Sequence, residues 1–204
     1  INLTPGTSRL VFADLDHDNK VDLIVTKYGC HEIYWGQGPN KKFIKDTNAF
    51  SGYCSNAVGV QLIDVNNDNL LDIVIVNYWL DKDLANTIPL SPNLASSRLK
   101  QPGGQSSLFL NKGNRKFEKT SLLDVLAPNY SNNAGIADIN NDGYLDIFIA
   151  NDYAYDRLLI NHGGKFFTEE TKDYMPFAFH GLNGMNADFA DFDQDGDLDL
   201  YVGN

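Results

Sequence analysis

The stretch that decides the fold is "ADFDQDGDLDLYVGN", residues 190–204, which places five aspartates within the nine positions 191–199 and then continues into an apolar run. Like charges this close repel one another, so the turn needs solvent or a cation to relieve the repulsion. A single acidic turn could simply be solvated. The chain, however, contains nearly the same segment four times.

The four acidic segments align without gaps. They begin with "ADLDHDNKVDLIV" at Ala13, "IDVNNDNLLDIVI" at Ile63, "ADINNDGYLDIFI" at Ala137 and "ADFDQDGDLDLYV" at Ala190. The shared pattern is D-x-[DN]-x-D-[GN]-x-x-D, followed by alternating apolar residues. We number its positions 1 to 9 and call the segments turn 1 (14–22), turn 2 (64–72), turn 3 (138–146) and turn 4 (191–199). Internal repetition of this kind decides the architecture before any single element does.

A second, weaker line recurs between the acidic turns. It starts at Ile33, Leu108 and Leu158, and consists of an apolar run, a glycine-bearing turn and a Lys-Phe pair. Each unit therefore predicts four short strands, which in the first repeat lie near residues 9–13, 22–26, 32–35 and 42–45. Units of about 50 residues with four strands are typical of propeller blades. A β-sandwich is the alternative, but it would not explain an acidic turn at a fixed phase.

We therefore predict an all-β fold, a β-propeller of four-stranded antiparallel blades, with about three and a half blades in the chain. The whole of 1–204 is read as one partial propeller domain, with repeats near 9–58, 59–132, 133–185 and 186–204. The second repeat is longer than the others, which predicts an insertion at 81–107. This Pro-, Ser- and Gly-rich insertion is either a surface excursion or a partner-contact loop.

Each acidic turn has the composition of a site for a hard divalent cation. Positions 1, 3, 5 and 9 carry side-chain oxygens, position 7 offers a backbone carbonyl, and position 6 is Gly or Asn, which enter the left-handed backbone conformation most easily. Six to eight oxygen ligands are what Ca²⁺ takes, whereas Mg²⁺ holds its water and zinc or copper favours His and Cys. The predicted ligands of up to four Ca²⁺ ions are Asp14, Asp16, Asp18, Lys20 and Asp22; Asp64, Asn66, Asp68, Leu70 and Asp72; Asp138, Asn140, Asp142, Tyr144 and Asp146; and Asp191, Asp193, Asp195, Asp197 and Asp199.

Two alternatives compete with this interpretation. The first is a solvated turn rich in Asp and Asn, which four phase-locked copies make less attractive. The second is an EF-hand, which needs Glu at position 12 and helical flanks. Position 12 is instead apolar in every copy, and the flanks predict strands. The residues at position 12 are Val25, Ile75, Ile149 and Val202.

The acidic pattern, with an N-x-G-x-x-F line between its copies, resembles the FG-GAP or VCBS repeats of integrin α-subunit propellers. The "LFLN" line (108–111) is similar to the bacterial and cartilage acidic protein branch of that superfamily. The resemblance implies a ring of about seven blades, with Ca²⁺ in the hairpin between the first two strands of each blade. It also implies an extracellular or periplasmic setting and a role in adhesion or assembly. Asn19 and Asn69 replace the usual Gly, and Asn66 and Asn140 each remove a charge, so sites two and three are expected to bind more weakly than site four.

Composition narrows the partners. The net charge is −11, and 23 of the 27 acids are Asp, a bias toward the short carboxylate that suits tight turns. A negative field of this size argues against nucleic acid or an anionic membrane as partner, and no apolar window is long enough to span a bilayer. The chain opens at Ile1 without Met, which is read as a processed or truncated piece. Missing sequence or another chain is expected to complete the ring, since a partial ring leaves apolar sheet edges open.

No catalytic constellation is visible, so the chain is predicted not to be an enzyme. His17, His31, His162 and His180 form no ligand spacing, and no Ser lies in a G-x-S-x-G elbow. Cys30 and Cys54 are expected to form a disulfide if the chain is secreted, with two buried thiols as the alternative. Sequons at Asn2 and Asn129 matter only in a host that glycosylates.

The leading hypothesis is a calcium-binding extracellular or cell-surface β-propeller that acts as an interaction or assembly module for a protein or glycan. Two alternatives stay open. One is a domain of a secreted hydrolase, lyase or lectin, because propellers host such functions. The other is a structural subunit of a cell-surface complex or filament, in which the open ring edge is the joint.

Overall fold

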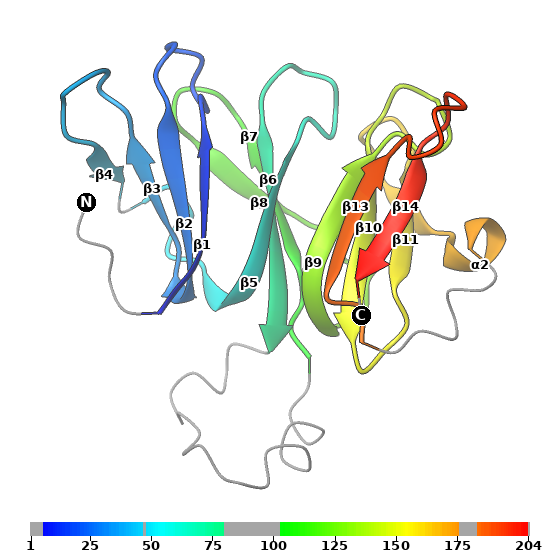
Figure 1. Ribbon diagram of the computed structural model, residues 1–204. Helices are drawn as coiled ribbons and strands as arrows, with labels where there is room; N and C mark the ends of the chain where they lie inside the picture. The colour runs from blue at the N-terminus through cyan, green and yellow to red at the C-terminus, as the bar shows by residue number, and fades with distance from the viewer. Residues whose placement is uncertain (1–5, 47, 80–102, 176–182, 204) are drawn as a thin grey trace, which may run out of the picture.

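The computed structural model describes residues 6–46, 48–79, 103–175 and 183–203, which form three four-stranded antiparallel blades and one two-stranded hairpin (Figure 1). Blade 1 contains β1 (Thr7–Ala13), β2 (Asp22–Cys30), β3 (Glu32–Trp35) and β4 (Ile44–Asp46). Blade 2 contains β5 (Cys54–Ile63), β6 (Asp72–Trp79), β7 (Ser107–Asn111) and β8 (Phe117–Thr120). Blade 3 contains β9 (Tyr130–Ala137), β10 (Asp146–Asp152), β11 (Arg157–Asn161) and β12 (Phe167–Glu169), and is followed by α2 (Thr171–Tyr174). The final hairpin pairs β13 (Asn186–Ala190) with β14 (Asp199–Gly203).

The strands follow the apolar alternation that predicted them. In each blade the strands pair in chain order, first with second, second with third and third with fourth. The prediction of an all-β propeller with four-stranded antiparallel blades is confirmed. The strands predicted for the first repeat match β1 to β4, with differences of a few residues at their ends.

The blades pack face to face through three apolar cores. The core between blades 1 and 2 includes Ile24, Trp35 and Phe109, and the core between blades 2 and 3 includes Val74 and Ile147. A third core joins blade 3 to the final hairpin and contains Phe148, Leu158 and Ala187. Each sheet is therefore covered by the next sheet along the chain, which is how a propeller buries strands that are apolar on both faces.

Blades 1 and 2 are joined by more than side-chain packing. The far end of β2 pairs with the start of β5, with Tyr28 opposite Asn56 and Cys30 opposite Cys54. These two cysteines form a disulfide, so the predicted bridge is confirmed and the alternative of two free thiols is wrong. The bridge closes the seam between the blades at the end opposite turns 1 and 2.

All four acidic turns lie at one end of the blades, at the top of Figure 1, because each connects the first strand of a sheet to the second. The fold thereby gathers segments about 50 to 75 residues apart into one rim. The predicted insertion 81–107 lies outside the described residues except for 103–107. Asn2 and His180 lie outside them as well.

Candidate metal sites

The four turns share one backbone shape. Position 6 has a positive φ in every copy, as predicted, at 61° and 66° for Asn19 and Asn69 and at 87° and 101° for Gly143 and Gly196. Position 4 also has a positive φ in every copy, between 57° and 64°, although no glycine signals it there. The residues at position 4 are His17, Asn67, Asn141 and Gln194. Two left-handed residues separated by one residue curl the chain tightly enough to turn the side chains at positions 1, 3 and 5 toward one centre.

The side-chain oxygens at positions 1, 3 and 5 organise this curl by accepting its N–H groups. In every turn the N–H of position 5 donates to Oδ1 of position 1 at 3.1 Å and to Oδ1 of position 3 at 3.0–3.3 Å. The N–H of position 6 donates to Oδ2 of position 1 at 2.8–3.1 Å. The N–H of position 7 donates to Oδ1 of position 5 at 2.9–3.0 Å. The second oxygen of position 5, and that of position 3 where it is Asp, therefore take no described backbone hydrogen bond.

Position 9 has a different task, because it anchors the turn to its sheet. Its Oδ2 accepts the N–H of position 2 at 2.8–3.1 Å in all four turns. In the three complete blades its Oδ1 accepts the N–H of the residue that follows or ends the third strand, at 2.7 Å. Asp22, Asp72 and Asp146 are buried, whereas Asp199 in the two-stranded hairpin is exposed.

Burial raises the pKa values of these anchoring carboxylates. It raises the pKa of Asp72 to about 6, with smaller raising contributions from the nearby charges of Asp68 and Asp64, against the lowering effect of its two N–H donors. Burial likewise raises the pKa values of Asp22 and Asp146. The negative charges of each turn thus oppose one another, and a cation in the turn would relieve that opposition.

The asparagine of the second repeated line connects neighbouring acidic turns by hydrogen bonds. Asn111 ends β7 and donates its side-chain amide to the carbonyl of Leu15 in turn 1 at 2.9 Å, while its N–H holds Asp72 in turn 2. Asn161 ends β11 and does the same between turns 2 and 3, donating to the carbonyl of Val65 at 2.8 Å. Each asparagine therefore ties the turn of its own blade to the turn of the preceding blade.

The side-chain oxygens that could reach one cation differ among the turns. In turns 1 and 4, positions 1, 3 and 5 each offer one carboxylate oxygen, and the three oxygens lie within 4.8 Å of one another; neither group includes position 9. In turns 2 and 3, position 3 is Asn, and its amide nitrogen donates to Oδ2 of position 5 at 3.0 Å. In these two turns position 3 therefore has no second oxygen, and the second oxygen of position 5 already accepts a hydrogen bond.

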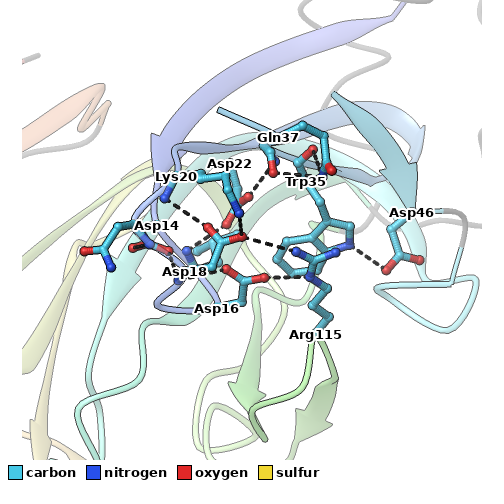
Figure 2. Close-up of polar contacts among 12 residues, drawn as sticks. Asp14, Asp16, Asp18, Lys20, Asp22, Trp35, Gln37, Asp46 and Arg115 are labelled. Carbon is cyan, nitrogen blue, oxygen red and sulfur yellow. Dashed lines mark hydrogen bonds and ion pairs between the residues drawn. The ribbon is translucent and has the colours of Figure 1, made fainter. Parts of the chain in front are cut away.

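The donor chemistry of the turns fits a hard divalent cation. Every candidate side-chain ligand is an oxygen of Asp or Asn, and the curl holds these oxygens in place before any ion arrives. Turn 4 suits the cation best, because all of its aspartates are exposed and no described basic side chain contacts them. In turn 1, by contrast, Lys20 and Arg115 lie against the carboxylates, as Figure 2 shows.

The comparison with protein families agrees with this repeated geometry. The family model described as an FG-GAP-like repeat matches residues 14–75, 94–149 and 138–202, and these ranges contain all four turns. The chain belongs to the FG-GAP-like repeat family. The resemblance inferred from the acidic pattern is confirmed. A comparison with curated proteins finds no matching relative.

The opposite end of this FG-GAP-like propeller holds polar residues that the sequence did not reveal as a unit. His31, Ser55 and Asn77 are buried and hydrogen bonded in series, with His31 Nε2 2.8 Å from Ser55 Oγ and Ser55 Oγ 2.5 Å from Asn77 Oδ1. His31 Nδ1 accepts the N–H of Lys27 at 3.2 Å, so Nε2 carries the proton and donates to the serine. Burial, followed by the charge of Lys27, lowers the pKa of His31 to about 4.

This series does not have the arrangement of an acyl-transfer pair. A histidine that donates to a serine cannot also accept that serine's proton, and the Ser55 hydroxyl donates its hydrogen to Asn77. Ser131 and Asn151 repeat the Ser–Asn contact in blade 3 at 2.8 Å, without a histidine. The repetition indicates that the contact supports the blade. α2 has four residues, and nothing helical in the described ranges could reach across a bilayer.

Proposed function

We propose that this FG-GAP-like propeller is a calcium-binding interaction module of the cell exterior, with up to four ions held in the acidic turns. The observation that carries the proposal is the recurrence of one preorganised curl, in which the second oxygens of positions 3 and 5 are left free by the backbone in turn 4. The proposed ligands are those at positions 1, 3, 5, 7 and 9 of each turn, as the sequence predicts.

A bound Ca²⁺ would supply positive charge between carboxylates that otherwise repel. The residues of the chain then determine what this charge stabilises. Asp72 and Asp146 connect their turns to the third strands of their own sheets, and Asn111 and Asn161 connect them to the preceding turns. Stabilising one turn would therefore stabilise two blades and the seam between them, so metal binding and folding are linked.

The outer faces of the first and last sheets carry exposed apolar residues that a further partner would cover. On β1, Val11 points into the core with blade 2, whereas Leu10 and Phe12 point away and are 42% and 59% exposed. On β14, Leu200 packs inward and Tyr201 is 61% exposed. Sheet faces of this kind are covered in propellers, so we propose that further sequence or another chain covers them.

The disulfide supports an oxidising compartment, either extracellular or periplasmic. In such a setting calcium is abundant enough to fill weak sites as well as strong ones. A protein or glycan is then the proposed ligand of the completed ring, whose presented loops are set by the calcium-stiffened rim.

The calcium proposal is tested by melting the metal-free chain with EGTA, with Ca²⁺ and with Mg²⁺ at equal concentration. We expect Ca²⁺ to raise the melting temperature by about 5–10 °C and Mg²⁺ to do much less. Asp195→Asn should lose part of the calcium response, whereas Asp124→Asn, which removes an exposed charge outside the turns, should keep it. Equal melting temperatures in EGTA and in Ca²⁺ would refute the proposal.

The proposal of a covered edge is tested by the native mass of the purified chain. We expect self-association or capture of a further chain, which charged substitutions such as Phe12→Glu and Tyr201→Glu reduce. A stable monomer that resists aggregation and is indifferent to both substitutions would contradict it.

A further inference from the structure

Turn 1 differs from the other turns in what contacts its uncommitted oxygens. Arg115 Nε lies 2.6 Å from Asp16 Oδ2, and Lys20 Nζ lies 2.6 Å from Asp18 Oδ2. Arg115 Nη2 approaches the same Asp18 oxygen at 3.6 Å. These are the second oxygens of positions 3 and 5, which the backbone leaves free in turns 1 and 4 and which a divalent cation would require.

Arg115 is held in this position by groups other than the carboxylates. It belongs to the hairpin between β7 and β8 of blade 2, and its guanidinium lies 4.8 Å from the ring centre of Trp35 in blade 1 (Figure 2). The indole N–H of Trp35 donates in turn to Asp46 Oδ2 at 2.9 Å. Stacking on an indole that is itself fixed reduces the entropy that the arginine loses on pairing, and it strengthens the contact.

The equivalent place on blade 3 provides a comparison within the same chain. The hairpins of blades 2 and 3 align through Asn111 opposite Phe117 and Asn161 opposite Phe167, which puts Lys165 where blade 2 has Arg115. Turn 2, which that hairpin faces, has Asn66 where turn 1 has Asp16. Lys165 is exposed, and the described ion pairs do not include it. The arginine thus occurs with the extra carboxylate, and the lysine with the amide.

We infer that Arg115, assisted by Lys20, is the resident cation of turn 1 and competes with a divalent ion for Asp16 and Asp18. This inference rests on the proposed calcium function and adds that the four turns are unequal. Turn 1 then has the lowest divalent affinity, although it has as many aspartates at positions 1, 3, 5 and 9 as turn 4. The ion pairs of Arg115 hold the seam between blades 1 and 2 without metal, whereas the later turns depend on the ion.

Terbium titration of the full chain tests this inference, because Tb³⁺ replaces Ca²⁺ at oxygen sites and its luminescence reports a nearby indole. Trp35 lies beside turn 1, and Trp79 lies at the far end of β6 from turn 2, so tryptophan-excited emission is a signal for turn 1. Ca²⁺ competition then gives the calcium affinity of the same turn.

We expect Arg115→Gln to raise the affinity of turn 1 for Tb³⁺ and for Ca²⁺ by about tenfold, the effect of removing one charge-assisted pair. Lys20→Gln should change it in the same direction, which guards against a folding defect peculiar to either variant. Lys165→Gln is the matched control, with the same charge change on the equivalent hairpin, and should leave the signal unchanged. In EGTA, Arg115→Gln should lower the melting temperature and Lys165→Gln should not.

The outcomes separate this inference from the proposed function. Calcium binding at the other turns, with no gain at turn 1 in either Arg115→Gln or Lys20→Gln, overturns the resident cation alone. A gain of equal size in Lys165→Gln also overturns it, because the effect would then be one of net charge. No terbium or calcium response from the wild type or any variant overturns both proposals.

Discussion

The two ends of the blades satisfy their backbone N–H groups in different ways. At the acidic end, every turn satisfies its N–H groups with Asp, or at position 3 with Asp or Asn, at the same positions. At the opposite end, the N–H that follows the second strand's apolar run donates to His31 Nδ1 in blade 1, to Ser106 Oγ in blade 2 and to Asp156 Oδ1 in blade 3. One end thus collects like charges that a cation can bridge, and the other uses unlike residues and a disulfide. The two ends should therefore respond to different changes in solution.

The largest expected effect separates the anchoring carboxylate from the carboxylates that face the centre of a turn. Asp72→Ala leaves the buried N–H groups of Val65 and Asn111 without their acceptor, which should cost about 4 kcal/mol of unfolding free energy. Asp68→Ala, at an exposed position of the same turn, should cost about 1 kcal/mol in EGTA. Denaturant unfolding in EGTA measures both.

The same two variants can be compared again in the presence of calcium. If Asp68 contributes to metal binding, the loss in Asp68→Ala should grow when Ca²⁺ is added to both proteins, because the wild type gains stability that the variant cannot. Equal losses for the two variants in EGTA would mean that position 9 is not the anchor that its two hydrogen bonds indicate.

The acidic end could be predicted from the sequence because its chemistry is tied to residue type. Four aspartate patterns at one phase predicted the hairpins, the blades and the left-handed residue at position 6. Position 4 was missed because no copy has glycine there and Gln194 carries no signal for a positive φ, so the position shows no shared residue type. The N-x-G line was seen, but not that Asn111 and Asn161 clasp the preceding turn, since that contact joins residues 96 positions apart.

The opposite end could not be predicted for a complementary reason. His31, Ser106 and Asp156 occupy equivalent places and accept equivalent N–H groups, yet they share neither charge nor shape. Only the backbone demands an acceptor there, and several side chains can supply one. Arg115 was missed similarly, because its partner Asp16 is 99 residues away in the chain.

The next largest effect concerns the disulfide at the opposite end. Replacing both Cys30 and Cys54 by Ser should lower the unfolding free energy by about 3.5 kcal/mol, the chain-entropy value for a loop closed over a separation of 24 residues. Because the bridge is far from the acidic rim, we expect the same loss in EGTA and in saturating Ca²⁺. Denaturant unfolding of both proteins in both conditions gives a thermodynamic cycle.

Additivity in this cycle is the result that supports two independent ends. A loss in the double variant that disappears when calcium is present would show that the disulfide and the acidic turns stabilise the same step. The comparison of the two ends would then fail, because the blade would transmit strain along its full length.

The smallest effect tests the opposite end with protons. Burial lowers the pKa of His31 from 6.5 to about 4. The folded chain therefore keeps the imidazole neutral over a pH range in which the unfolded chain becomes protonated. As the pH falls from 6.5 toward 4, the unfolded state takes up more protons and the stability that His31 contributes is lost, by about 3 kcal/mol. Below pH 4 the loss levels off.

His31→Gln should remove this slope, and the difference between the two proteins isolates it from the carboxylates. Asp72 has the opposite sign, because its pKa is raised to about 6; the stability it contributes is present below its ordinary value of 3.8 and is lost as the pH rises through 6. That contribution is common to both proteins in EGTA and cancels in the difference. Parallel curves of unfolding free energy against pH would mean that His31 is hydrated in the folded chain, and that the polar series with Ser55 and Asn77 is open to water.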